Sequence, residues 1–179
     1  MFHNDKNTDT ADLGYGYSQV LPILLKIVLS AQLNETNKSA IIDEAISKSP
    51  SFMSYIDSLK PTLVIEEPEA NLHPNLQAKL ADVFVLANKT FGTHFILETH
   101  SEYLIRKLQY LSAKNEITQD DAVIYYFNAD EYVNENEPKV KEIKINEFGG
   151  LSDSFGPGFY DEATNLKFEL MKLNKSQSN

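Results

Sequence analysis

Two short apolar runs in this sequence each end in polar side chains of the kinds that bind metals or anions. The first run, residues 63–65, leads directly into Glu66 and Glu67. Carboxylates at the end of a strand suit magnesium binding and water activation, because Mg²⁺ prefers oxygen ligands and keeps several of its waters. The competing interpretation is a buried strand that ends in an ordinary charged turn.

The second run, residues 95–97, leads to His100 and Ser101. A histidine between a strand end and a helix N-terminus can donate to an anion, and the free amides and dipole of the helix assist. The competing interpretation is a capping or surface histidine.

A glycine-containing turn near the start of the chain is the third candidate. It holds Gly14, Gly16, Ser18 and Gln19 just before an apolar segment. Glycine permits a close backbone approach to phosphate, and the N-terminus of a following helix offers unpaired amides. An ordinary glycine turn has the same residues, so this pattern alone is weak.

Hydrophobic periodicity predicts the elements that must position these side chains. Strands alternate with helices in most of the chain, and two later strands follow each other across a polar stretch. This order predicts an α/β fold, a mainly parallel sheet flanked by helices, with a late β-hairpin and a C-terminal helix. We expect buried strands at 62–66 and 94–98, later strands at 122–127 and 140–145, and helices at 18–34, 39–48, 51–60, 74–91, 101–111 and 159–173.

Two residues are predicted to define the start of the first helix. Ser18 is predicted to cap it, and Pro22 fits its first turn, where the missing N–H has no intrahelical partner. The helix is expected to end near Asn34.

The composition and net charge of the chain argue against several classes of function. A length of 179 residues with 42% apolar residues predicts one globular domain. The absence of cysteine excludes disulfides, thiolate zinc sites and a cysteine nucleophile. A net charge of −10, from 26 acidic and 16 basic residues, disfavours non-specific DNA binding. The longest apolar stretch, residues 20–29, is far short of the roughly 20 apolar residues of a membrane span, and we expect a soluble, cytoplasmic protein with no membrane partner.

The order of these motifs adds information that none carries alone. A Gly-Ser-Gln turn is followed by the string EEPEANLHP from Glu66 to Pro74, and then by THSE from Thr99 to Glu102. This succession resembles the C-terminal half of an ABC-type AAA ATPase head, in the OLD-like, DUF3696-containing prokaryotic branch. Residues 1–12, which are polar and lack periodicity, are expected to be a flexible N-terminus, and residues 174–179 a tail. The resemblance makes residues 13–173 the ATPase half, with a helical insertion at 35–60 and a DUF3696-like segment at 121–162.

The resemblance implies a role for each matching position. Glu66 takes the Walker B position on the Mg²⁺ shell, and Glu67 takes the place of the catalytic carboxylate. His100 corresponds to the switch histidine at the γ-phosphate. The remaining positions would bind nucleotide across a dimer interface: Gly14, Gly16, Ser18 and Gln19 as the signature segment, and Asn71 and His73 as the D-loop.

The sequence departs from the family pattern in one important respect. No GxxxxGK[ST] string occurs anywhere in the chain. That string forms the phosphate-binding loop of P-loop ATPases. The resemblance therefore implies a partner, either an N-terminal P-loop half or another chain. It also implies a homodimer joined through ATP sites, and a nuclease effector or nucleic acid in the intact system.

Three functions follow from these observations. The leading one is the Walker B portion of an ATPase that hydrolyses ATP with Mg²⁺ at a dimer interface and controls an effector in phage defence; the isolated chain should be inactive. The alternative is a non-catalytic regulatory or scaffold module that associates with a P-loop partner. A third hypothesis is a metallohydrolase that uses Glu66, Glu67, His73, His94 and His100.

Overall fold

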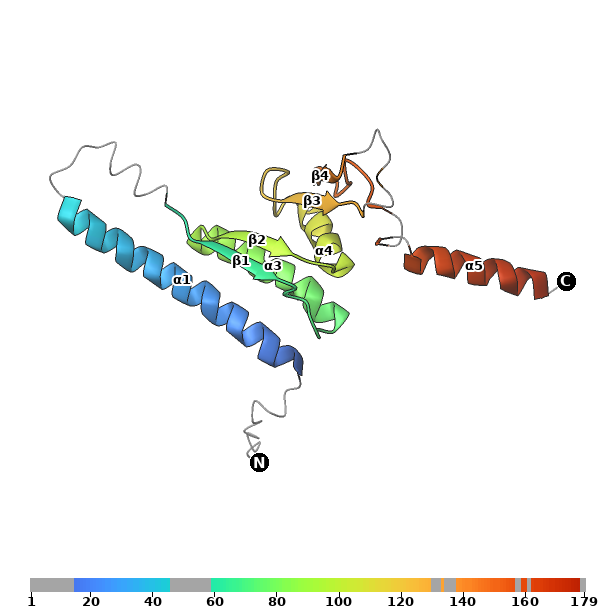
Figure 1. Cartoon of the computed structure of the whole chain (residues 1–179), viewed down its shortest axis with the longest axis horizontal. Helices are drawn as coiled ribbons and strands as arrows, with labels where there is room; N and C mark the ends of the chain where they lie inside the picture. The colour runs from blue at the N-terminus through green and yellow to red at the C-terminus, as the bar shows by residue number, and fades with distance from the viewer. Residues whose placement is uncertain are drawn as a thin grey trace, which may run out of the picture. The chain divides into compact units, whose positions relative to one another are not determined.

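The first part of the chain contains two neighbouring parallel strands that are connected along the sequence by a helix (Figure 1). The computed structural model describes residues 15–45, 59–129, 133, 138–156, 159–160 and 162–177. Strand β1 (Thr62–Glu66) pairs in parallel with β2 (His94–Glu98), from the Thr62–His94 pair to the Glu66–Glu98 pair. Both strands have the bounds that the sequence predicts, and with the helices they confirm the α/β fold class.

Helix α3 (Pro74–Phe91) connects the two strands, and its ends follow from local sequence signals. Pro74 opens the helix, and Gly92 ends it in the left-handed conformation with φ 65°. The buried residues Leu80 and Phe84 lie on the predicted apolar stripe, and the Phe84 ring centroid is 4.9 Å from that of Phe95 in β2. This contact packs α3 on one face of the strand pair.

The prediction that both strands are buried holds for one face only. Along β1 and β2, half-buried and exposed residues alternate. Val64 and Ile96, partners in the register, are 67% and 60% exposed on the face away from Phe95. The reason is that a strand is buried on both sides only where both faces are covered, and the described residues cover one.

Helix α1 (Tyr15–Ala45) is longer than predicted. It does not end near Asn34, and the predicted separate helix from Ser39 is its continuation. No glycine or proline lies between these residues, so nothing interrupts the backbone hydrogen bonds of the helix. Residues 46–58 of the predicted segments lie outside the described residues. Leu59 and Lys60 are predicted to be helical, but the structure shows no helix at either residue.

The beginning of α1 also differs from the prediction. Because the helix starts at Tyr15, Ser18 lies inside it rather than at its cap, and Pro22 lies in its interior. Its buried residues Ile23, Ile27 and Ala31 recur at helical spacing. None of the helices in the described ranges is long and apolar enough to cross a bilayer.

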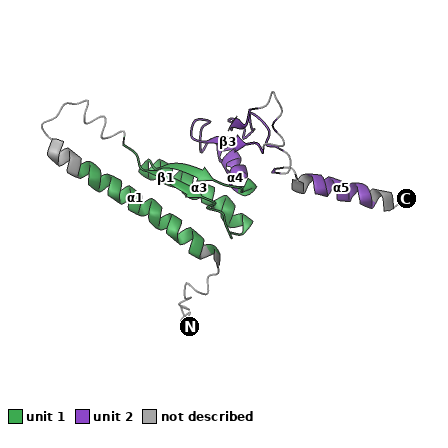
Figure 2. Ribbon diagram, in the orientation of Figure 1, with its two compact units in different colours: residues 1–103 green, residues 104–179 purple. Residues whose placement is uncertain are grey.

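The chain divides into two compact units, residues 1–103 and 104–179, where its length predicted one domain (Figure 2). The second unit contains most of α4 (Glu102–Ala113) and the antiparallel pair of β3 (Val123–Phe127) and β4 (Val140–Lys144). This pair confirms the predicted hairpin strands. Each unit has its own two-stranded sheet and its own buried apolar residues, which is why the contacts separate into two groups.

Hydrogen bonds from two side chains of α4 to backbone carbonyls hold the loop after β4 against this helix. The Oγ of Ser112 donates to the carbonyl of Asn146 at 2.8 Å, and the Nε2 of Gln109 donates to the carbonyl of Gly149 at 2.7 Å. A Cβ on Gly149 would lie 2.6 Å from the carbonyl oxygen of Gln109, so only glycine fits there. Helix α5 (Glu162–Gln177) begins after the predicted residue 159 and extends beyond the predicted end at Leu173.

We expect Gly92→Ala to lower the free energy of unfolding by about 1 kcal/mol, because a Cβ disfavours the left-handed backbone. The nearest atoms to such a Cβ belong to the Lys60 side chain at 3.7 Å, so the cost is conformational rather than steric. Urea denaturation measures it. Gly92→Asn is the matched control and should be closer to wild type, since asparagine adopts this conformation more readily. An alanine variant as stable as the wild type would contradict the prediction.

Candidate functional site

Three carboxylates gather at the carboxyl ends of β1 and β2. Glu66 and Glu98 are partners in the parallel register, and the backbone N–H of Glu67 donates to the carbonyl of Glu98 at 2.9 Å. All three side chains are exposed. Sequence reasoning identified Glu66 and Glu67 but missed Glu98. Its place at the end of a strand parallel to the first was the signal that could have found it.

A hollow of about 420 Å³ lies at these strand ends, and α1 contributes to it. Gln19 comes from the first turns of α1, whereas the other lining residues come from the strand ends and the following turn. The lining residues are Gln19, Glu66, Glu67, Ala70 and Glu98. The structure therefore places one predicted signature residue beside both predicted carboxylates.

The start of α1 approaches the loop after β1 closely. A Cβ on Gly16 would lie 3.3 Å from the Cδ2 of Leu72 and 3.7 Å from the Cδ1 of Leu76. A larger side chain would move the helix away from that loop. Gly16 and Ser18 lie in the first helical turn of α1 rather than in a separate turn. Gly14 lies outside the described residues.

The loop that carries Glu67 has an unusual backbone. Glu67 has φ 43° and Asn71 has φ 60°, both in the left-handed region. Such residues are uncommon outside glycine, and at functional sites the surrounding contacts hold them in place. Here the N–H of Ala70 donates to the carbonyl of Glu67 at 3.0 Å, and the N–H of Leu72 donates to the carbonyl of Glu69 at 3.0 Å.

Two of the predicted site residues in this region are exposed and have different surroundings. Asn71 lies in the turn itself. His73 is the N-cap of α3, and its Nδ1 accepts from the N–H of Asn75 at 3.3 Å. The histidine ring is therefore oriented by helix capping.

His100 follows β2 in a second loop beside the first. Its side chain is exposed, and its backbone N–H donates to the Oε1 of Glu69 at 2.6 Å. The structure thus connects the His100 loop to the loop that carries Glu67. Sequence reasoning assigned no role to Glu69, and it is buried.

The metallohydrolase hypothesis finds no site in the part of the chain that the structure describes. No group of three or more histidine, aspartate or glutamate side chains is arranged there to hold a metal ion. His94 begins β2 and His100 follows its other end. Magnesium needs a smaller protein donor set, one or two carboxylates together with substrate phosphates. The adjacent strand ends of Glu66 and Glu98 fit that requirement.

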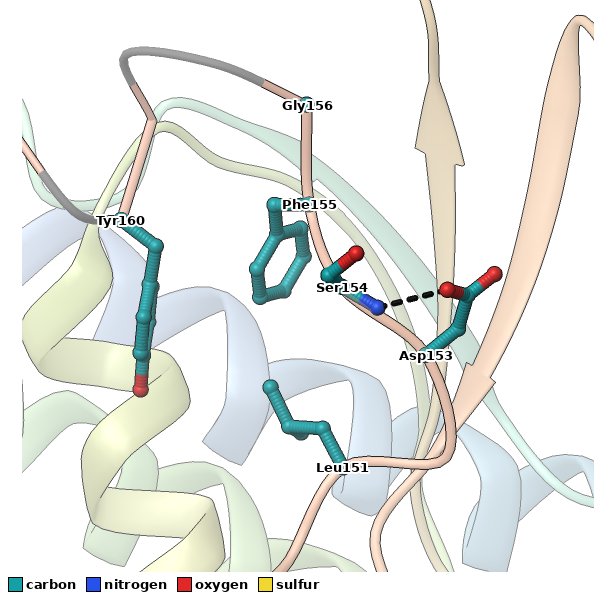
Figure 3. Close-up of a pocket in the computed structure, with 6 residues that line it drawn as sticks. All are labelled: Leu151, Asp153, Ser154, Phe155, Gly156 and Tyr160. Carbon is teal, nitrogen blue, oxygen red and sulfur yellow. Dashed lines mark hydrogen bonds between the residues drawn. The ribbon is translucent and has the colours of Figure 1, made fainter.

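A second hollow, of about 460 Å³, lies in the second unit (Figure 3). The rings of Phe155 and Tyr160 lie near each other, with centroids 5.2 Å apart, and the guanidinium of Arg106 is 4.2 Å from the Tyr160 ring centroid. The carboxylate of Asp153 accepts from the N–H of Ser154 at 2.7 Å. None of the predicted site residues lines this hollow, which is formed by Leu151, Asp153, Ser154, Phe155, Gly156 and Tyr160.

Comparison with known protein families agrees with the motif order. Residues 1–105, more than half of the chain, match the family described as AAA ATPase domain. Residues 117–170 match DUF3696, a family of unknown function. No curated protein and no solved structure matches the chain. The matches confirm the resemblance to an AAA ATPase and to DUF3696. The chain belongs to the AAA ATPase domain family, which implies nucleotide binding and an ATPase-type function.

Proposed function

We propose that this chain supplies the Walker B, signature, D-loop and switch-histidine portion of an ABC-type, OLD-like ATPase. The observation that carries the proposal is the shared hollow at the strand ends that Glu66, Glu67 and Glu98 line together. Three carboxylates from the ends of two strands that are distant in sequence belong to one surface. Such a surface suits phosphoryl chemistry, in which the protein contributes mainly positioning and charge.

The proposed roles follow from the geometry at the strand ends. Mg²⁺ would supply positive charge to the phosphates, held by Glu66 with help from Glu98. The carboxylate of Glu67 accepts a proton from the attacking water and orients it. His100, whose side chain is exposed next to the start of α4, donates to the γ-phosphate.

The remaining predicted residues act across the dimer in this proposal. The signature segment meets the nucleotide of the opposite subunit through Gly14, Gly16, Ser18 and Gln19. Asn71 and His73 are exposed in and beside the turn after β1, and they line the interface between subunits. Closure of a homodimer around ATP then controls a nuclease effector or the engagement of nucleic acid, in cytoplasmic defence against phage.

The phosphate-binding loop must come from outside the residues of this chain. The hollow holds three carboxylates, and carboxylates repel a polyphosphate unless a cation lies between them. The sequence contains no Walker A string. We therefore propose a P-loop half or partner chain that completes each site.

In the ATPase completed with a P-loop segment, Glu67→Gln should lower turnover by about 10²-fold or more, the scale of losing a positioned proton acceptor. ATP binding should persist, because an amide keeps the shape and removes a negative charge. Phosphate release measures turnover, and calorimetry measures binding. The control is Glu147→Gln, at an exposed site in the second unit. Near-normal turnover by Glu67→Gln would reject the proposed role.

His100→Ala should reduce turnover by about 10- to 100-fold, equivalent to one hydrogen bond to a charged group. Nucleotide affinity should change less, since the contact strengthens as charge develops in the transition state. Steady-state kinetics together with ATP and ADP titrations separate the two effects. His94→Ala is the matched control, an exposed histidine at the opposite end of β2. Equal loss of ATP and ADP affinity with unchanged turnover would indicate a structural role instead.

The isolated 179-residue chain should fold and self-associate, yet neither bind ATP tightly nor hydrolyse it. Self-association is expected because apolar residues such as Val64 and Ile96 are exposed on one face of the sheet. Light scattering and calorimetry with ATP and Mg²⁺ test both points. Micromolar affinity without a P-loop segment would overturn the half-site proposal. Binding of a P-loop partner without any gain in turnover would favour the scaffold alternative.

A further inference from the structure

Glu69 is a buried carboxylate that the proposed chemistry does not use. It lies in the loop between β1 and α3, directly after the buried Pro68, and only 8% of it is exposed. Glutamate is rarely buried to this extent, because removing a carboxylate from water is costly unless hydrogen bonds compensate. Its position therefore calls for a specific contact.

That contact is with the loop that carries the candidate histidine. The Oε1 of Glu69 accepts from the backbone N–H of His100 at 2.6 Å, across 31 positions of the sequence. The Oε2 is also buried and has no hydrogen-bond partner among the residues that the structure describes. Since charge-assisted hydrogen bonds are short and strong, this single contact is a strong link between the two loops.

A second bridge joins the same two loops through α3. The Nε2 of Gln77 donates to the carbonyl of Leu72 at 2.9 Å, while its Oε1 accepts from the Oγ of Ser101 at 2.6 Å. Ser101 directly follows His100. The two bridges hold the backbone at 100–101 to the loop at 69–72, next to the left-handed Glu67.

We propose that Glu69 is a positioning residue that holds His100 in register with Glu67 at the strand ends. The proposal rests on the proposed ATPase function, and Glu69 itself does not touch the substrate because its carboxylate is buried. Alanine removes the acceptor, and aspartate keeps the charge but is one methylene too short for the same contact. Glutamine keeps an acceptor at Oε1 and should be the mildest change.

The contact can be tested without catalysis, by amide hydrogen exchange of the 179-residue chain. In Glu69→Ala, the His100 amide should exchange about tenfold faster, the scale of one lost hydrogen bond. The Glu67 amide, bonded to the carbonyl of Glu98, is the internal control and should stay protected. Glu69→Gln should keep most of the protection. Unchanged exchange at His100 in Glu69→Ala would overturn the proposal, and Glu69→Asp provides the same comparison if the alanine variant does not fold.

A double-mutant cycle in the completed ATPase tests the positioning role. Glu69→Ala should lower kcat about tenfold with little change in KM, but should lower it less than twofold when His100 is already alanine. Equal losses in both backgrounds would show that Glu69 acts independently of His100 and would overturn the proposal.

The proposed function fails by a different result, namely normal turnover of Glu67→Gln with Glu69 intact. That result would also remove the reaction that Glu69 serves, and so would reject its positioning role. The hydrogen-exchange comparison would still report whether the contact between Glu69 and His100 exists.

Discussion

The parallel pairing of β1 with β2 is the constraint on which the candidate site depends. In a parallel pair, both carboxyl ends lie at the same edge, and the register sets Glu66 opposite Glu98. An antiparallel pairing would place the second strand's end at the far edge and would separate the loops after the two strands. Because the pair is parallel, Glu67 and His100 follow neighbouring strand ends although 32 residues separate them along the sequence, from position 67 to position 100.

The electrostatics of this edge are the reason that we propose a cation and a P-loop partner for nucleotide binding. Three exposed carboxylates surround the hollow at the strand ends, in a chain whose net charge is −10. A polyphosphate approaches such a surface favourably only with a divalent cation and with donors from another segment. In the proposed ATPase the same charges would become useful with Mg²⁺ bound, since one carboxylate would hold the ion while its neighbour orients water.

The two loops at the strand ends are tied by side chains rather than by regular secondary structure. Glu69 reaches the backbone of His100, and Gln77 bridges Leu72 and Ser101. These bonds surround a backbone in which Glu67 is left-handed, a conformation that costs roughly 1–2 kcal/mol for a residue with a Cβ. These bonds therefore connect the loop that carries Glu67 to the loop that carries His100.

Local sequence signals were sufficient to predict most of the elements and the chemical character of the candidate site. Local signals set both strands, 62–66 and 94–98, and the helix between Pro74 and Gly92, because proline and glycine act through backbone geometry within one turn. Motif order indicated the ATPase family. By contrast, the helix that we expected to end near Asn34 runs to Ala45, because no glycine or proline interrupts its hydrogen bonds there.

Which distant residues lie together depends on tertiary packing and could not be predicted from local signals. The place of Glu98 at the site, the single covered face of the strands and the bond from His100 to Glu69 all depend on strand register and on packing between segments. Hydrophobic periodicity predicts which residues of a strand share one face. It does not predict which face of the sheet another element covers. The sequence likewise does not distinguish a buried glutamate from an exposed one. The hydrogen-bond partner of such a glutamate is defined only when the two loops come together in space.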